Sequence, residues 1–203
     1  SGAHSTNGKP LLANDMHLAH GIPSLWYEVD LVSPDFHAAG VSVPGMPFVV
    51  AGHNEHIAWG FTSLYGDTQD VYIEAPDAVT THVAEVIHIR GGADVSLDVG
   101  ITAHGPVISP MLRNEKRVLS LKWNIYDAAI TGLPLYELDR AKDWNEFESA
   151  LKQWWAPTLN TIYADDHGHI GYQAIGWIPL RANGLIGMPA SGNEADWQGH
   201  VPF

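Results

Sequence analysis

An acidic turn stands out among the segments that could carry chemistry. The stretch YGDTQDVYIE, residues 65–74, places Asp67 and Asp70 on either side of Gln69, directly before the alternating run Val71-Tyr72-Ile73. Such alternation is typical of a half-buried strand. Two carboxylates at the start of that strand repel each other unless something positive lies between them. The turn therefore indicates a nearby positive charge.

Histidines form a second group with metal-binding potential. His53 and His56 lie in the segment GHNEH, and others occur at positions 17, 20 and 37. A zinc protease helix requires the order His-Glu-x-x-His, so that both imidazoles share one helical face. GHNEH lacks that order and lies between two predicted strands. The sequence therefore argues against catalytic zinc, and we interpret His53 as a turn histidine.

Composition limits the classes of protein to be considered. The 203 residues suit one large domain or a piece of a larger protein, and 45% of them are hydrophobic, which is enough for a core. The formal charge of −13 comes from 10 Lys and Arg against 23 Asp and Glu. Without a basic block to neutralise phosphates, we expect no nucleic-acid partner.

The sequence also limits which disulfides, cysteine-based metal sites and membrane spans the chain can have. The chain has no cysteine, which excludes disulfides and cysteine-based zinc sites. No apolar run reaches the length of a membrane span, and no signal peptide opens the sequence. If the parent protein is exported, its targeting segment lies outside these residues.

Most of the pattern predicts β-strands. Short apolar or alternating runs follow one another, and Gly, Pro, Asn or Asp stands at most of the breaks between them. We predict strands at residues 11–13, 24–31, 38–43, 48–51, 57–62, 71–74, 83–89, 95–102, 117–123, 161–164 and 170–175.

The helical signal is confined to one region. Asp143 followed by Glu146 predicts a capping box, and Trp144, Phe147 and Leu151 recur at helical spacing after it. A shorter helix is expected to begin near Pro134. Without a repeat, linker or low-complexity tract, we predict a single domain over residues 1–203.

Six segments in consistent order resemble one known family. They are GKPLLANDMHL (8–18), PSLWYEVDL (23–31), GMPFVVAGHNEHIAWGFTSLYGDTQDVYIE (45–74), TAHGPVIS (102–109), LNTIYADDHGHIGYQAIGWIPLR (159–181) and DWQGHVPF (196–203). Together they resemble the β-subunit of the penicillin acylases, which are N-terminal-nucleophile amidohydrolases. The resemblance covers nearly the whole chain.

The resemblance implies hydrolysis of an amide by a serine that self-cleavage of a precursor exposes. The α-amino group of that serine serves as the base, and an oxyanion hole stabilises the tetrahedral intermediate. In the family this serine opens a Ser-Asn-x-Trp segment that precedes the position of Ser1. The chain instead opens Ser-Gly-Ala-His. We therefore interpret Ser1 as a boundary residue and expect this chain alone to lack the nucleophile and to be inactive.

Two positions match the oxyanion-hole donors of the family. Asn160, in LNTIYAD, matches the asparagine whose side-chain amide donates to the oxyanion. Ser63, in WGFTSLYGD, matches the residue whose backbone N–H is the second donor. Ser63 directly follows one predicted strand and Asn160 directly precedes another. The end of a strand holds a residue rigidly, as an oxyanion donor requires.

Four further positions carry roles that the resemblance implies. His17 matches a residue lining the nucleophile pocket, although Met16 stands where relatives have proline. Arg181 matches an arginine near the active site. Leu18 and Ala51 match acyl-pocket positions that are often aromatic, so a longer or bulkier acyl chain is expected.

The resemblance also offers a cation for the acidic turn. In relatives the stretch that matches GDTQD contributes to a structural calcium site. Asp67 and Asp70 would bind through their carboxylates and Gln69 through its carbonyl oxygen, which are the hard donors that Ca²⁺ prefers. Other ligands would come from segments outside this chain.

The expected fold is α+β, a part of the four-layer αββα sandwich of antiparallel sheets. The expected partners are the missing α-subunit, the remainder of the β-subunit and a small N-acyl amide, such as a β-lactam or an N-acyl homoserine lactone. The resemblance places the parent protein in the periplasm or outside the cell. A function of a different class remains open: the parent protein would be a non-catalytic, calcium-stabilised binding module on a degenerate acylase scaffold.

Overall fold

The computed structural model describes residues 1–16, 18–126, 133–181, 188–191 and 196–203. The chain divides into two compact units. Unit 1 comprises residues 1–66, 131–177 and 203, and unit 2 comprises residues 67–130 and 178–202. The single domain expected from the sequence stays a prediction, and each unit is described by itself.

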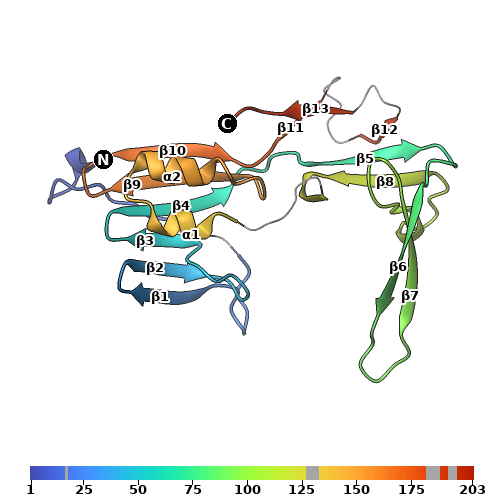
Figure 1. Ribbon diagram of the computed structural model, residues 1–203, viewed down its shortest axis with the longest axis horizontal. Helices are drawn as coiled ribbons and strands as arrows, with labels where there is room; N and C mark the ends of the chain where they lie inside the picture. The colour runs from blue at the N-terminus through green and yellow to red at the C-terminus, as the bar shows by residue number, and fades with distance from the viewer. Residues whose placement is uncertain (17, 127–132, 182–187, 192–195) are drawn as a thin grey trace. The chain divides into compact units, whose positions relative to one another are not determined.

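Unit 1 is built on a six-stranded antiparallel sheet with the strand order β1-β2-β3-β4-β9-β10. Consecutive strands are neighbours up to β4, and β9 then pairs with β4 across a long connection (Figure 1). The strands are β1 (Tyr27–Ser33), β2 (Phe36–Ser42), β3 (Ala51–Asn54), β4 (Ile57–Ser63), β9 (Leu159–Asp165) and β10 (Ile170–Ile175).

Two helices pack against this sheet and close its core. They are α1 (Leu135–Arg140) and α2 (Trp144–Leu151). The predicted cap of α2 is confirmed, because the side chain of Asp143 accepts a hydrogen bond from Glu146 N at 2.9 Å. Buried residues of both helices and of the central strands form one hydrophobic cluster, which includes Leu138, Phe147, Trp59, Phe61 and Tyr163.

Unit 2 consists of three small sheets. Antiparallel β5 (Gln69–Glu74) and β8 (Val118–Trp123) are joined by a short parallel strand, β12 (Ala190–Ser191). The other sheets are the pairs β6 (Thr81–Ile87) with β7 (Val95–Ile101), and β11 (Pro179–Arg181) with β13 (Trp197–His200). Short 3-10 helices occur at Gly2–His4 in unit 1 and at Ser109–Met111 and Asn124–Tyr126 in unit 2.

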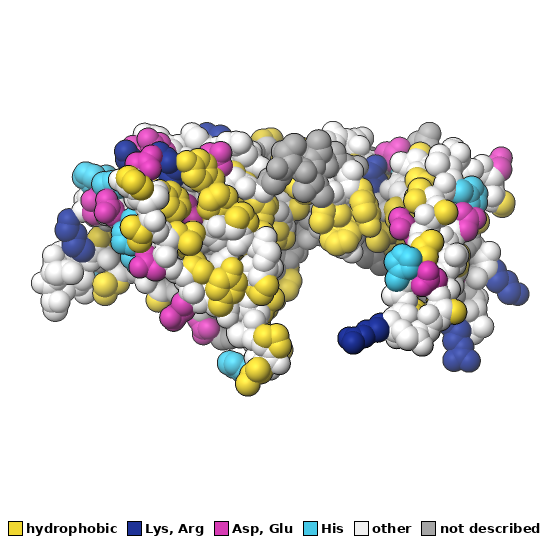
Figure 2. All heavy atoms as spheres, turned by 60° about the horizontal axis from the view of Figure 1, so that its bottom comes forward, with side chains coloured by type: hydrophobic (Ala, Val, Ile, Leu, Met, Phe, Trp, Pro, Cys, Tyr) yellow, Lys and Arg dark blue, Asp and Glu magenta, His cyan; other side chains and the backbone are white. Residues whose placement is uncertain are grey.

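The β6–β7 pair is an amphipathic hairpin. Its register places Val83 opposite Val99 and Glu85 opposite Leu97, so the side chains of alternate residues share a face. One face is largely apolar and carries Val83, Ile87, Val95, Leu97, Val99 and Ile101. Four of these side chains, Val83, Ile87, Val95 and Leu97, are exposed, and Figure 2 shows that hydrophobic side chains do reach the protein surface.

The predicted α+β class is confirmed, and most predicted elements are present. The helix expected near Pro134 is α1, and the hairpin turn at residues 165–168 joins β9 to β10. Two strand predictions were wrong: residues 11–13 form no strand, and the strand expected at 48–51 lies at Ala51–Asn54. No helix in the described part of the chain is long and apolar enough to cross a membrane.

Candidate active site

Strands β4 and β9 bring Ser63 and Asn160 together. They are antiparallel neighbours, with Thr62 opposite Asn160 and Ser63 opposite Leu159. The side-chain Nδ2 of Asn160 donates a hydrogen bond to the backbone oxygen of Ser63 at 3.1 Å. Two residues that lie 97 positions apart in the sequence therefore share one location at the end of a strand pair.

The register also fixes the direction of the Ser63 N–H. Leu64 N donates to Thr158 O at 3.2 Å, so Leu64 and Thr158 form a hydrogen-bonded pair across the two strands. Hydrogen-bonded pairs alternate along an antiparallel ladder, so Thr62 and Asn160 form the next such pair. The N–H of Ser63 belongs to the same peptide as the carbonyl of Thr62, so it points away from β9. On that side β3 pairs with β4 only at Trp59 and Ala58. Among the described strands, none pairs with β4 at Ser63 on this side.

Asn14 holds the same edge of β4 two residues earlier. Its Nδ2 donates to Phe61 O at 3.0 Å, and its Oδ1 accepts from Phe61 N at 3.1 Å. Gly60 permits this approach, since a Cβ there would lie 2.8 Å from the Asn14 side chain. Asn14 thereby replaces a strand partner next to Ser63. No local pattern in the sequence links residues 47 positions apart, so this role of Asn14 was not predicted.

Tyr172 completes the surroundings of Asn160. Its hydroxyl donates to Asn160 Oδ1 at 2.6 Å from the neighbouring strand β10. The amide of Asn160 is therefore held at both ends, by Tyr172 and by Ser63. The tyrosine was also missed, although it lies in the segment that resembles the family.

A pair of neighbouring N–H donors at a strand end can stabilise a developing negative charge. The second Nδ2 hydrogen of Asn160 and the N–H of Ser63 are the groups that an oxyanion hole requires. Asn160 is partly exposed and Ser63 is exposed, so both are accessible to solvent. The hydrogen bond between Asn160 and Ser63 places these two donors close together, and their oxyanion role stays a prediction.

At the acidic turn of unit 2, the positive group between the carboxylates is Arg181. Its Nε donates to Asp70 Oδ2 at 2.8 Å, and its Nη2 donates to the backbone oxygen of Asp67 at 3.0 Å. The same Nη2 lies 3.4 Å from Asp67 Oδ1. Asp70 Oδ2 accepts a further hydrogen bond from Trp197 Nε1. Arg181 thus lies between the two carboxylates of the acidic turn, and its place near the active site stays a prediction.

This arrangement does not fit a calcium ion at Asp67, Gln69 and Asp70. Calcium takes six to eight oxygen ligands, and a guanidinium fixed between the two carboxylates repels a divalent cation. One oxygen of Asp70 is already engaged twice. Calcium at this turn remains a prediction that requires ligands from outside the described residues and another position for Arg181.

The other predicted positions fall in different surroundings. His17 lies outside the described residues. Leu18 is exposed, whereas Ala51 is buried at the start of β3, opposite Val41. Their acyl-pocket roles stay predictions.

A second polar cluster in unit 2 surrounds His104. Its Nδ1 lies 2.9 Å from Glu74 Oε1, and its Nε2 lies 2.9 Å from Asp196 Oδ1. Burial opposes ionisation of Glu74, but hydrogen bonds from Ser120, Thr102 and His104 outweigh it and lower the pKa of the carboxyl. Burial raises the pKa of Tyr72, whose ring stacks on His104, to about 12. The cluster fixes the TAHGPVIS segment against β5 and β8.

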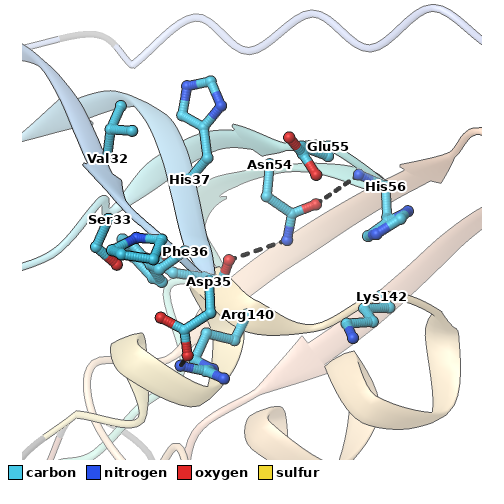
Figure 3. A pocket seen from close by; sticks show the side chains of 12 residues that line it. Val32, Ser33, Asp35, Phe36, His37, Asn54, Glu55, His56, Arg140 and Lys142 are labelled. Atoms are coloured by element: carbon cyan, nitrogen blue, oxygen red, sulfur yellow. Dashed lines mark hydrogen bonds and ion pairs between the residues drawn. The ribbon is translucent and has the colours of Figure 1, made fainter.

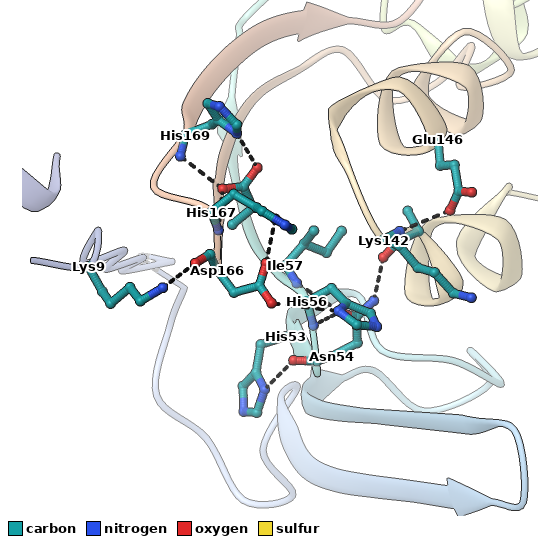
Figure 4. A network of polar contacts seen from close by, with 12 residues as sticks. Lys9, His53, Asn54, His56, Ile57, Lys142, Glu146, Asp166, His167 and His169 are labelled. Carbon is teal, nitrogen blue, oxygen red and sulfur yellow. Dashed lines mark hydrogen bonds and ion pairs between the residues drawn. The ribbon is translucent and has the colours of Figure 1, made fainter.

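Asn54 connects the β3–β4 turn of unit 1 with α1. Its Oδ1 accepts from the backbone N–H groups of His56 and Ile57 at 2.8 and 2.9 Å (Figure 4). Its Nδ2 donates to the carbonyl oxygens of Asp139 and Ala141 at 2.9 and 2.7 Å. His53, interpreted above as a turn histidine, is exposed on β3 and approaches the Asn54 carbonyl at 3.2 Å.

Asn54 also lines a hollow of about 450 Å³ in unit 1, between the β1–β2 turn and the end of α1. Figure 3 shows groups of both signs around it, including Asp35, Glu55, Arg140 and Lys142. None of the predicted site residues that the structure describes lines this hollow. Its mixed charge favours no single class of ligand.

Comparisons with known proteins identify the family of the chain. The penicillin amidase family model matches residues 1–203. The acyl-homoserine lactone acylase QuiP of Pseudomonas aeruginosa is 34% identical over 97% of this chain, and the penicillin acylase 2 proenzyme of Pseudomonas sp. strain SE83 is 28% identical over 98% of it. Among solved structures, the thermostable penicillin G acylase from Alcaligenes faecalis has a TM-score of 0.72 and 28% identity, and covers 89% of this chain.

The relatives are much longer than this chain. It spans 26% of the Pseudomonas aeruginosa acylase, 28% of the proenzyme and 35% of the solved chain. The family match nevertheless extends over every residue. The chain therefore belongs to the penicillin amidase family.

Proposed function

We propose that this chain is part of an amidohydrolase that removes the acyl group from an N-acyl amide. The observation that carries the proposal is the meeting of Asn160 and Ser63 at the ends of β9 and β4. Relatives that are named acyl-homoserine lactone acylase and penicillin acylase support the same reaction class. N-acyl homoserine lactones and β-lactam amides are the substrate classes that follow from those names.

In the proposed mechanism, a serine hydroxyl from outside residues 1–203 attacks the amide carbonyl. The α-amino group of that serine accepts the hydroxyl proton, and negative charge develops on the carbonyl oxygen. Ser63 N–H and Asn160 Nδ2 donate hydrogen bonds to this oxygen. Collapse of the tetrahedral intermediate breaks the C–N bond, and the amine leaves with the proton that the α-amino group had accepted. Water then hydrolyses the acyl-enzyme to the carboxylic acid and the free serine.

The test uses the full-length protein that carries this chain, with an N-acyl homoserine lactone and penicillin G as probes. We expect turnover of at least one probe and a loss of about 10²- to 10³-fold in kcat for Asn160→Ala. Asn145→Ala, at an exposed position of α2, is the matched control and should keep full activity. An active protein indifferent to Asn160→Ala would remove the proposed role. Folded protein without turnover would favour the binding module.

Calcium and cellular location belong to the proposal for the full-length protein. Calcium would require oxygen ligands beyond Asp67, Gln69 and Asp70, and its uptake can be measured by titration. Fractionation of cells that produce the full-length protein tests the periplasmic or secreted location.

A further inference from the structure

We infer that Tyr172 is a positioning residue that sets the orientation and donor strength of the Asn160 amide. This inference rests on the proposed function, because it assigns Tyr172 a task in the same site. Its starting point is the 2.6 Å hydrogen bond from the Tyr172 hydroxyl to Asn160 Oδ1.

The two ends of the Asn160 amide are distinguishable by their partners. The backbone oxygen of Ser63 can only accept, so the atom 3.1 Å from it must be the nitrogen. The oxygen of the amide then faces Tyr172, whose hydroxyl can donate to it. The Ser63 contact thus selects one of the two possible flips of the side chain, and the Tyr172 hydroxyl holds the amide oxygen in that flip. The selected flip aims the N–H groups at the Ser63 end of β4.

The same contact changes the strength of the donor. A hydrogen bond to the carbonyl of an amide polarises its N–H groups, because bonds in a chain strengthen one another. Tyr172 therefore makes Asn160 a stronger donor to a developing oxyanion. Without the hydroxyl, the amide loses its partner at Oδ1 and one of the two contacts that hold it in place.

The position of Tyr172 allows its role in positioning Asn160 to be tested separately from any role in stabilising the fold. It lies on β10, the edge strand of the sheet, and its side chain is 58% exposed. Removing only its hydroxyl leaves the ring and the strand pairing in place. Tyr27 offers a matched control, because it lies on β1, the opposite edge strand, and is 41% exposed.

The experiment compares Tyr172→Phe, Tyr27→Phe, Asn160→Ala and the double variant Tyr172→Phe/Asn160→Ala in the full-length protein, with the two probes named above. We expect Tyr172→Phe to lower kcat about tenfold with an unchanged KM, since a misplaced group impairs the transition state more than binding. Tyr27→Phe should match the wild type. Because Tyr172 acts through Asn160, the double variant should lose no more than Asn160→Ala alone.

The outcomes separate this inference from the proposed function. If Asn160→Ala loses activity while Tyr172→Phe equals Tyr27→Phe, the inference is overturned and the proposed function stands. If the losses in the double variant multiply, Tyr172 acts independently of Asn160 and the inference is also overturned. If Asn160→Ala keeps full activity, this inference and the oxyanion role of Asn160 fail, while the amidohydrolase function stands. A folded wild type without turnover would remove the proposed function itself.

Discussion

At the scale of single residues, the site depends on side chains that serve backbone groups of distant segments. Asn160 and Asn14 both bond residues of β4, and Arg181 bonds Asp67 and Asp70. Family motifs in the sequence identified Asn160, Ser63 and the acidic turn. They did not identify Asn14 or Tyr172, because those contacts depend on strand register, which the local pattern does not contain.

Asp139 gives a prediction at this scale. Its carboxyl is 1% exposed, and Oδ2 accepts from Val49 N at 2.9 Å, while Oδ1 has no partner among the described residues. Burial raises its pKa to about 7. Between about pH 4 and pH 7 the unfolded chain loses this proton while the folded chain keeps it, so the free energy of unfolding falls as pH rises.

Asp139→Asn removes this titration and keeps an acceptor for Val49. We compare the free energy of unfolding of the variant with that of the wild type. The difference, variant minus wild type, should increase by up to about 4 kcal/mol from pH 4 to pH 8. Urea unfolding of the 203-residue chain across that range measures the difference, with Asp77→Asn in an exposed turn as control. A parallel pH dependence for Asp139→Asn and wild type would contradict the prediction.

Arg181 gives a second prediction. Its side chain is 10% exposed and that of Asp70 is 8% exposed, so removal of the guanidinium leaves a nearly buried carboxylate without its cation. We expect Arg181→Met to lower the free energy of unfolding by about 3 kcal/mol. Arg140→Met, which removes the more exposed and longer contact to Asp35 at 3.6 Å, should cost less than about 1 kcal/mol. Equal losses of unfolding free energy in the two variants would show that the Arg181–Asp70 pair does not stabilise the fold more than an exposed ion pair does.

The same variant tests the calcium prediction. Arg181 and calcium would compete for the carboxylates of Asp67 and Asp70. Calcium should therefore raise the unfolding temperature of Arg181→Met more than that of the wild type. Identical responses to calcium would rule out this competition.

At the scale of elements, hydrophobic periodicity and turn residues located most strands and both helices. The N-cap at Asp143 is a local signal, and it was predicted correctly. Strand β3 begins later in the sequence than predicted because of its contacts with β2. Val50 N donates to Val41 O, and Gly52 packs so closely on Gly40 that a Cβ on Gly52 would lie 2.8 Å from the Gly40 Cα. Strands β11, β12 and β13 are short and pair with distant segments, so periodicity did not show them.

Asn54 gives the prediction for this scale, because it joins three elements. Asn54→Ala deprives two N–H groups and two carbonyl oxygens of a partner. We expect a loss of about 2–4 kcal/mol in the free energy of unfolding, with Asn145→Ala close to zero. Urea unfolding monitored by tryptophan fluorescence measures both. A loss below about 1 kcal/mol for Asn54→Ala would show that solvent replaces its contacts.

At the scale of the whole molecule, the chain is acidic and presents apolar surface on the β6–β7 hairpin. A two-stranded hairpin is marginal by itself, and an exposed apolar face favours association. The relatives are about four times as long, since this chain spans 26% of the Pseudomonas aeruginosa acylase. We therefore expect the isolated 203-residue chain to self-associate through this face.

Sedimentation velocity of the isolated chain tests this expectation. Leu97→Lys, on the apolar face, should shift the distribution toward monomer, because a buried lysine charge opposes the contact. Ser96→Lys, on the opposite face of the same strand, should change it little. A wild-type chain that stays monomeric at high concentration would refute the association.

The most direct test of the central claim is a crystal structure of the full-length protein with an N-acyl amide bound. We expect the carbonyl oxygen of the ligand to lie within about 2.7–3.1 Å of both Ser63 N and Asn160 Nδ2. A ligand whose carbonyl oxygen contacts neither atom, at a site that performs the hydrolysis, would contradict it.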